Sequence, residues 1–534
     1  MRHPSHIRSL IMLIVIPVLA PMALSAQGTI EGTVTFWGDP GGGTQIEVAA
    51  HSAPTGPPDA TVFVSLPGGA YSIPVPDGNY FIATLMSRDG VFGEPRDEDV
   101  LVWYDADGDG NRDTVTVSGG AVTGVDIDLG FVYVDIDATG GNNGSSWTDA
   151  FTGLQDGVDL AISGIEVWVA EGIYVPGASR SDSFVPKIGV RVYGGFVGGE
   201  TIRQQRNWFN QTTILSGEIG STAATDNCYH VVRAEASNTT AMLNGLTITR
   251  GYANGGSIDD HGGGVRARGG GVTLANVTIL DNYATIGGGV MVNLGGTVKA
   301  YNSSFINNRA PGFEGGGYYG STASAQPLTL VNCVFTGNSA WRGGGVALTS
   351  VGLQPELVNL SLSGNSAGGE GGGIYVDTST SFTIHNSILW GNTGPNPQIS
   401  AYAGVGWPTV NYSIIQDGWT HGGTHIVDAD PSFADAALRL NLDSPAIDAG
   451  DNSATPIDVH DVDENHWTDE PLGRDRDFNR RVRNIPYVPD TGNADPGDSI
   501  IDMGAYEAFD PTLVFWDDFE DQDLNEWSSV VGEI

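Results

Sequence analysis

The sequence predicts an all-β protein, a right-handed parallel β-helix with three strands per coil that follows a small β-sandwich domain. Two columns of asparagine and one column of glycine triplets recur in phase between residues 272 and 392, at spacings of 26 to 30 residues. A fixed period of this length is typical of a stacked solenoid. The apolar residues change parity once per repeat, which indicates short strands that meet at sharp corners.

The asparagine columns define two corners of each coil. The first column comprises Asn276, Asn302, Asn332, Asn359 and Asn386, and the second comprises Asn282, Asn308, Asn338, Asn365 and Asn392. Before the first corner the apolar residues are Val272 and Leu274, whereas after it Val277 and Ile279 have the opposite parity. Both strands can face the interior only if the chain bends at the asparagine, which tolerates a left-handed backbone. Asparagine is also a common turn residue, but two columns in phase with the apolar pattern predict stacked ladders with a structural role.

The glycine triplets complete the coil. They begin at Gly287, Gly315, Gly343 and Gly371, and each precedes a third apolar strand such as Val290 with Val292. Strands rather than helices follow them, so they are not phosphate-binding loops.

Composition limits the possible partners and the compartment. The 534 residues include 63 acidic and 23 basic side chains, a net charge of −40, which disfavours nucleic acid and anionic lipid and favours cations. Residues 1–26 have the basic start, apolar run and small-residue end of a signal peptide, and we expect cleavage after Ala26. No other segment is a candidate transmembrane span. The sequence therefore predicts a monomer that is secreted or exposed on the cell surface.

Only two cysteines, Cys228 and Cys333, are present. They fall several coils apart, and coils rise about 4.8 Å each. We therefore expect two buried thiols and no disulfide.

Residues 28–131 have short alternating strands, as in residues 32–36, 70–75 and 78–83, which predict a β-sandwich. The sequence G-T-V-T at residues 32–35 and Y-S-I-P-V-P-D-G-N-Y at residues 71–80 resemble carboxypeptidase-regulatory-like modules of secreted proteins. That resemblance implies a spacer or an accessory binding module.

A possible calcium loop lies inside this domain. Its oxygen-bearing side chains alternate around Gly110, and they are Asp105, Asp107, Asp109, Asn111 and Asp113. This matches the first half of a calcium loop, and the predicted role is structural. The twelfth position is Thr116 instead of an acid, so an Asp-Gly hairpin that joins residues 102–104 to 115–117 is the alternative.

We assign residues 132–430 to the β-helix, with a capping helix at 146–162. Ser146 and Asp149 resemble a capping box, and Phe151, Leu154 and Val158 keep helical spacing. Residues 431–509 lose the repeat and are expected to form a C-terminal cap region. Residues 510–534 resemble the first strand of a further, truncated domain.

The two ends of the β-helix resemble those of bacterial secreted proteins of the choice-of-anchor Q type, whose fold is similar to that of pectin lyases. The motifs that carry the resemblance are N-N-G-S-S-W at 142–147, V-A-E-G-I-Y at 169–174, S-P-A-I-D-A-G at 444–450 and D-M-G-A-Y-E at 502–507. The internal repeats resemble those of polymorphic outer-membrane proteins. This resemblance implies the fold and surface exposure, and it defines no reaction.

Because enzymes occur on pectin-lyase-like folds, one polar cluster of the sequence is a candidate catalytic site. The best candidates are Asp259, Asp260, His261, Arg266 and Arg268, since lyases use a basic residue beside carboxylates that hold calcium against an acidic sugar. The alternative, which we prefer, is a polar loop ahead of a glycine triplet. Two further patterns are weaker: Asp461, Asp463, Asp475 and Asp477 for a second cation, and the His421/His425 pair, which Gly422 and Gly423 keep from helical alignment.

Two functions follow. The first is a non-enzymatic surface scaffold for adhesion or for binding a polysaccharide or cell-surface glycan. The second is a polysaccharide lyase or glycoside hydrolase that acts on an acidic polysaccharide. The net charge counts against the second, because a polyanion would be repelled unless calcium bridged the two.

Overall fold

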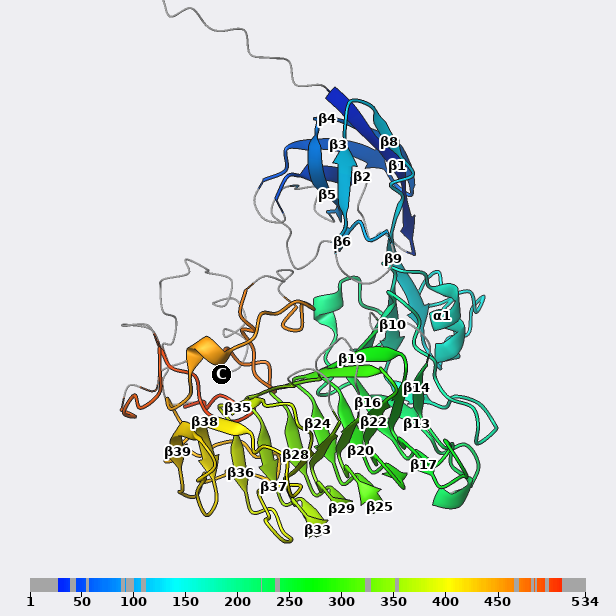
Figure 1. Cartoon of the computed structure of the whole chain (residues 1–534). Coiled ribbons are helices and arrows are strands. Elements are labelled where there is room, and N and C mark those ends of the chain that lie inside the picture. The colour runs from blue at the N-terminus through cyan, green and yellow to red at the C-terminus, as the bar shows by residue number, and fades with distance from the viewer. Residues whose placement is uncertain are drawn as a thin grey trace, which may run out of the picture.

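The computed structural model describes residues 27–510, apart from residues 39–44, 54–56, 88–91, 93–99, 107–111, 222, 236–240, 322–327, 351–354, 465–469, 482–484, 486 and 495–498. The described chain is almost entirely β, with long stacks of parallel strands, and the predicted fold class is confirmed. A small N-terminal domain sits at one end of a long ladder of coils (Figure 1). The leader at 1–26 and the tail at 511–534 lie outside the described residues.

The N-terminal domain contains two sheets. One comprises β1 (Gln27–Trp37), β4 (Gly68–Pro76), β8 (Ala121–Thr123) and β9 (Ile127–Val134). The other comprises β2 (Gln45–His51), β3 (Ala60–Ser65), β5 (Gly78–Met86), β6 (Val100–Trp103) and β7 (Thr114–Val117). Apolar side chains of both sheets, such as Ile30, Ile46 and Ile82, are fully buried between them. Strand β9 joins the domains, because residues 127–130 pair with β1 and residues 131–134 pair with β10.

The strands of the β-helix form three long sheets, and most coils contribute one strand to each. Sheet I contains β10 (Glu166–Ala170), β12 (Arg191–Phe196), β15 (Met242–Asn244), β19 (Gly271–Ala275), β23 (Thr297–Tyr301), β27 (Thr329–Val331), β31 (Glu356–Val358), β35 (Thr383–His385) and the first half of β38 (Thr409–Ile415). Sheet II contains β11 (Gly172–Tyr174), β13 (Thr213–Ser216), β16 (Leu246–Thr249), β20 (Thr278–Leu280), β24 (Ser304–Ile306), β28 (Val334–Thr336), β32 (Ser361–Ser363), β36 (Ile388–Trp390) and the second half of β38, whose whole length then pairs with β39 (Gly423–Val427).

Sheet III contains β14 (Val232–Glu235), β18 (Val265–Arg268), β22 (Val290–Asn293), β26 (Tyr318–Ser321), β30 (Val346–Thr349), β34 (Ile374–Asp377) and β37 (Ile399–Ala401). Between sheets II and III lies an additional sheet IV of shorter strands, which the sequence did not predict. It contains β17 (Tyr252–Ala253), β21 (Tyr283–Ala284), β25 (Arg309–Glu314), β29 (Ser339–Arg342) and β33 (Ser366–Glu370).

The first asparagine column forms the corner between sheets I and II. All five residues have a left-handed backbone, with φ between 46° and 56°. The bend lets Leu274 and Ile279, on its two sides, both reach zero exposure in the core. Their amides stack in part: Asn332 donates to Asn302 and Asn359 donates to Asn332, each over 2.9 Å.

The second column forms a continuous ladder with the opposite polarity. Each Nδ2 donates to the Oδ1 of the asparagine one coil further on, from Asn282 to Asn392, over 2.9–3.1 Å. The same Oδ1 also accepts the backbone N–H of the previous coil's asparagine. In this column the preceding residue, Asp281, Asn307 or a glycine, takes the positive φ. The ladder therefore satisfies amides that would otherwise be buried without partners.

The glycine triplets permit the coils to stack at this point. A Cβ atom on Gly289 would lie 2.4 Å from the carbonyl oxygen of Gly317 in the next coil. The backbone N–H of Gly289 donates to Gly316 over 3.0 Å, and the same bonding repeats in later coils. A side chain at this position would separate successive coils.

Three local features refine the sequence predictions. The helix α1 covers Leu154–Leu160 only; Ser146 and Asp149 do hydrogen-bond to each other, but in a turn that precedes the helix. Cys228 and Cys333 are buried and free, as predicted. Short helical turns occur at η1 (Arg203–Gln205), η2 (Ala224–Asp226) and η3 (Asn452–Ala454).

The alternative of a hairpin over residues 102–117 is wrong. β6 and β7 do not pair with each other, because both pair antiparallel with β5, end to end. β6 and β7 are separated by an interruption between Tyr104 and Asp113. The N–H of Asp113 donates to the Tyr104 carbonyl over 2.9 Å. β6 and β7 are thus two parts of one interrupted strand.

The described parts of residues 444–510, here called the C-terminal strap, lie along the asparagine corner and the outer face of sheet II. The strap first contacts a late coil, where the N–H of Asp451 donates to Asn386 over 2.8 Å. It then reaches the early coils, where Asp461 pairs with Arg203 over 2.9 Å and Glu464 pairs with Arg206. The strap finally runs back towards the late coils, where the N–H of Ala505 donates to Ser361 over 3.0 Å. The strap therefore covers groups that the corner leaves exposed.

We predict that Asn338→Ala destabilises the protein by about 2–4 kcal/mol, because it removes four side-chain hydrogen bonds inside the ladder and leaves buried donors of Asn308 without an acceptor. Denaturant unfolding followed by circular dichroism measures the change. The control is Asn210→Ala, since Asn210 is exposed, and it should change stability by no more than about 0.5 kcal/mol. Equal effects of the two substitutions would contradict the structural role of the ladder.

Candidate functional site

The predicted catalytic cluster lies on the outer face of sheet III, where Arg266 is its centre. Although Arg266 points outward from β18, it is only 2% exposed because the loop at 254–261 covers it. Its guanidinium pairs with Glu235 of the neighbouring strand β14 and donates to the carbonyl oxygen of Ile258 over 3.1 Å. The Asp259 carboxylate lies 3.6 Å from the same guanidinium. Arg266 thus ties the loop to the sheet.

His230, which the sequence analysis missed, completes this arrangement. Its Nδ1 lies 2.9 Å from the Gly262 carbonyl and its Nε2 lies 2.7 Å from Arg266 Nη1, so Nδ1–H donates and Nε2 accepts. Burial lowers the pKa of His230 to about 3, and the charge of Arg266 adds to the effect. The ring is therefore neutral at physiological pH and acts as an acceptor for the arginine. His230 precedes β14 and lies outside the alternation of that strand, so the sequence pattern gave no signal for it.

The structure brings only part of the predicted cluster together. Asp259 joins Arg266, whereas Asp260 and His261 form a separate contact of 3.3 Å between Oδ1 and Nε2. Arg268 is exposed at the end of β18. The five residues therefore do not converge on one reacting position.

This geometry does not suit Arg266 as a catalytic base. Burial lowers its pKa to about 10, so the guanidinium keeps its proton at neutral pH. A base must also reach the proton that it removes, and the 2% exposure of Arg266 prevents that. Its contacts are those of a buried structural ion pair.

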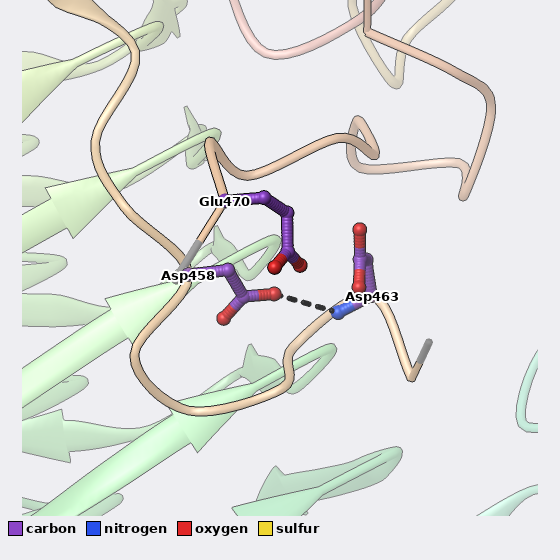
Figure 2. Close-up of side chains that lie close together, drawn as sticks. All are labelled: Asp458, Asp463 and Glu470. Carbon is purple, nitrogen blue, oxygen red and sulfur yellow. Dashed lines mark hydrogen bonds between the residues drawn. The ribbon is translucent and has the colours of Figure 1, made fainter. Parts of the chain in front are cut away.

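A group of three carboxylates on the C-terminal strap could hold a metal ion. Oxygens of Asp458, Asp463 and Glu470 lie within 4.8 Å of one another (Figure 2). The N–H of Asp458 donates to the Glu470 carbonyl over 2.8 Å, which joins two short segments and brings their side chains to one side. The Asp458 carboxylate also accepts the backbone N–H groups of Val462 and Asp463, over 2.8 and 3.2 Å.

The electrostatics of this group favour either protons or a cation. Burial, together with the nearby Asp463 and Asp461 carboxylates, raises the pKa of Asp458 to about 7. Both carboxylate oxygens of Glu470 are buried with no hydrogen-bond partner among the described residues. Oxygens that share a calcium ion lie about 2.3–2.6 Å from it, so a separation of up to 4.8 Å fits a bound cation.

The other predicted cation ligands have different environments. Asp107, Asp109 and Asn111 lie outside the described residues; Asp113 accepts the N–H of Ala106 over 2.7 Å. The four-aspartate hypothesis is wrong, because only Asp463 joins the group of three carboxylates. The remaining members contact other partners: Asp461 pairs with Arg203, Asp475 accepts backbone N–H groups of Asp477, Asn479 and Glu507, and Asp477 pairs with Arg439.

His421 and His425 do not form a metal pair. His421 stacks on Trp407 with ring centroids 4.0 Å apart, and His425 stacks on Tyr412 at 4.2 Å. Each ring therefore covers an aromatic side chain near the last coils.

Comparisons with known proteins agree with this architecture. Residues 210–431 match the family model described as "Right handed beta helix region". The chain contains a right-handed parallel β-helix. No curated protein sequence matches it.

Two of the similar solved structures are lyases. Pectate lyase Pel9A has a TM-score of 0.41 and 14% identity, over 71% of this chain and 96% of that chain. A rhamnogalacturonan lyase has a TM-score of 0.26 and 14% identity, over 57% and 85%. A family 28 exopolygalacturonase from Yersinia enterocolitica has a TM-score of 0.17 and 10% identity, over 74% and 95%. The likeness concerns the fold alone.

We predict that Arg266→Gln lowers the free energy of unfolding by about 2–3 kcal/mol, because it breaks the pair with Glu235 and leaves the neutral His230 without its donor. Chemical denaturation provides the measurement. Arg268→Gln is the matched control on the same strand, where an exposed guanidinium should contribute less than about 0.5 kcal/mol. If both variants unfold like the unmodified protein, Arg266 is not a structural tie.

Proposed function

We propose that this protein is a secreted or cell-surface β-helix scaffold that binds glycans and catalyses no reaction on them. The observation that carries the proposal is the burial of Arg266. Its guanidinium is engaged by an ion pair with Glu235 and a hydrogen bond to His230, so it is not accessible to a substrate. A long ladder with exposed loops is well suited to presenting binding surfaces.

Exposed aromatic side chains along sheet IV support a glycan-binding role. Phe313 and Trp341 are 44% and 50% exposed, and they precede the paired residues Glu314 and Arg342 of adjacent coils. Tyr252 and Tyr283 of earlier coils stack with ring centroids 4.5 Å apart. Exposed aromatic surface on one face marks an interaction site, and sugar rings present flat C–H faces that pack on such rings. We therefore place glycan contact on sheet IV.

The proposed location outside the cell rests on the leader at 1–26 and on the net charge of −40. Within the described ranges, no helix is long and apolar enough to cross a membrane. The motifs at 142–147 and 502–507 support a bacterial origin and the choice-of-anchor Q type.

The alternative is a polysaccharide lyase or glycoside hydrolase that acts on an acidic polysaccharide. The observation that favours it is the partly exposed Asp259, whose carboxylate lies 3.7 Å from His230 and 3.6 Å from Arg266. Acid–base chemistry on a sugar requires such residue types. Under this alternative the loop at 254–261 must open to admit a substrate.

We predict that incubation with uronate polymers and calcium yields no unsaturated ends and no new reducing ends, while the protein is retained on a polysaccharide matrix. Trp341→Ala should weaken retention, because it removes half-exposed aromatic surface from sheet IV. Phe63→Ala is the control, since Phe63 is equally exposed but belongs to the N-terminal domain. Release of unsaturated or reducing ends that Asp259→Asn abolishes would favour the enzymatic alternative.

We also propose that the carboxylates of Asp458, Asp463 and Glu470 bind calcium in a structural role. In the absence of metal, the raised pKa of Asp458 means that the folded state binds a proton more tightly than the unfolded state does. That contribution to stability is present at low pH and is lost as the pH rises to about 7. Calcium should replace the proton above this range.

We predict that calcium raises the unfolding midpoint at pH 7.5 relative to EDTA, by about 2.7 kcal/mol in free energy at a hundredfold excess over Kd. The effect should be much smaller at pH 5, where Asp458 is protonated. Glu470→Gln should remove most of the effect, whereas the exposed Glu171→Gln should retain it. A calcium effect unchanged in Glu470→Gln would place the ion elsewhere, for example at residues 105–113.

A further inference from the structure

A pocket opens where the C-terminal strap stops covering sheet II. From the last coils inward, Met503 of the strap packs against Ile388 and Ile414. The N–H of Ala505 donates a hydrogen bond to Ser361. Its last contacts with this face come from Arg476, which reaches Ser304 and Thr278. Beyond Thr278, the outer face of the earlier coils meets the segment that carries Trp208 and Phe209 instead.

This pocket has a volume of about 190 Å³, enough for one small ring. Trp208 and Phe209 line it on the side of the early coils, Thr247 and Thr278 of sheet II line its floor, and Arg476 lines the strap side. Hydroxyl groups, aromatic rings and a guanidinium thus surround one space. This combination fits a polar ring with an anionic group.

Arg476 is the residue that specifies charge. It is only 8% exposed, so its guanidinium has lost most of its hydration. Its side-chain partners are two hydroxyls: Nε donates to Ser304 over 3.0 Å and Nη2 donates to Thr278 over 3.3 Å. Among the described residues no carboxylate pairs with it. Arg481 of the strap differs in this respect, because it lies 3.8 Å from Glu507. Burying a charge without a counter-charge costs free energy. An anion bound to the Arg476 guanidinium would offset this cost.

The aromatic wall carries a second unpartnered group. Trp208 Nε1 is buried and has no hydrogen-bond acceptor in the described part of the chain. Its indole ring is held in place by Arg206, whose guanidinium carbon lies 4.3 Å from the ring centroid, and by Phe478 at 5.0 Å. The adjacent Phe209 is 48% exposed at the rim. A ligand hydroxyl can accept from the indole N–H while its ring packs on the aromatic surface.

We infer that this pocket binds a single sugar residue that bears a carboxylate, with the carboxylate on Arg476 and the ring against Trp208 and Phe209. The inference rests on the glycan-binding function proposed above and names a separate subsite, remote from sheet IV. The net charge of −40 does not oppose it, because charges beyond about 8 Å are largely screened at physiological salt. A single carboxylate meets the local guanidinium, whereas a long polyanion would meet the whole acidic surface.

Isothermal titration calorimetry of the full chain, in EDTA at pH 7, tests this inference with three probes. Galacturonic acid supplies both ring and carboxylate, galactose supplies the ring alone, and inorganic phosphate supplies an anion alone. We expect galacturonic acid to bind at least tenfold more tightly than either of the other two. Equal binding of phosphate would show a simple anion site and would overturn the inference.

Variants locate the binding. Arg476→Gln should weaken galacturonic acid at least tenfold and leave the weak binding of galactose unchanged, since only the charge is removed. Phe209→Ala should weaken both sugars, and its rim position spares the fold. Arg191→Gln, an exposed arginine on sheet I, is the matched control and should bind like the unmodified protein. Thermal melts verify that each variant is folded.

The outcomes separate this inference from the proposed function. If the protein is retained on polysaccharide through Trp341 but binds no galacturonic acid, the pocket inference fails and the glycan-binding proposal stands. If neither polymer nor monosaccharide binds, both fail. Binding of galacturonic acid that Phe209→Ala and Arg476→Gln leave unchanged would place the sugar elsewhere and would also overturn the inference.

Discussion

The structure depends on the coil-to-coil register of backbone and amide hydrogen bonds at the left-handed corners. A positive φ at Asn276 and its equivalents turns the chain while both flanking strands keep their apolar side chains inside. The second column then ties each coil to the next through paired bonds to one Oδ1 atom. Because these groups lie in a dry interior, each unsatisfied amide would be expensive. In the second column, repetition of the same residue at the same position supplies the partner for the amide of each successive coil.

The two asparagine columns end differently, and this difference determines where the candidate binding sites lie. The second column is continuous from Asn282 and ends on Gln398. The first is interrupted between Asn276 and Asn302 and again between Asn359 and Asn386, where buried amide atoms have no partner among the described residues. The strap adds two acceptors along this corner, because the carbonyls of Val462 and Arg474 accept from Asn276 and Asn332. The strap brings buried charges with it. Some find partners in the early coils, such as Asp461 with Arg203. For Arg476 and for the carboxylates near Asp458 we propose a ligand and a metal ion, respectively.

The sequence predicted local chemistry better than spatial convergence. Residue types at 259–268 suggested an acid–base cluster, and Asp259 and Arg266 do come together. Their partners Glu235 and His230, however, come from the preceding coil, 31 and 36 positions before Arg266. The pattern could not reveal them, because an insertion at 254–261 interrupts the repeat there. Nor could it show that the loop buries Arg266, since burial of an outward-facing residue depends on what packs above the sheet.

The sequence by itself determined the solenoid, its corners, its inward-facing residues and the fate of both cysteines. It could do so because each coil repeats the same local pattern of strands and corners. Residues at equivalent places in successive repeats therefore lie above one another in space. Only the tertiary structure decided the course of residues 444–510, the additional sheet IV, the gathering of Asp458 with Glu470 and the pocket beside Arg476. These features join segments that are far apart in the sequence and follow no period. Their contacts are set by which outer surfaces the β-helix leaves uncovered.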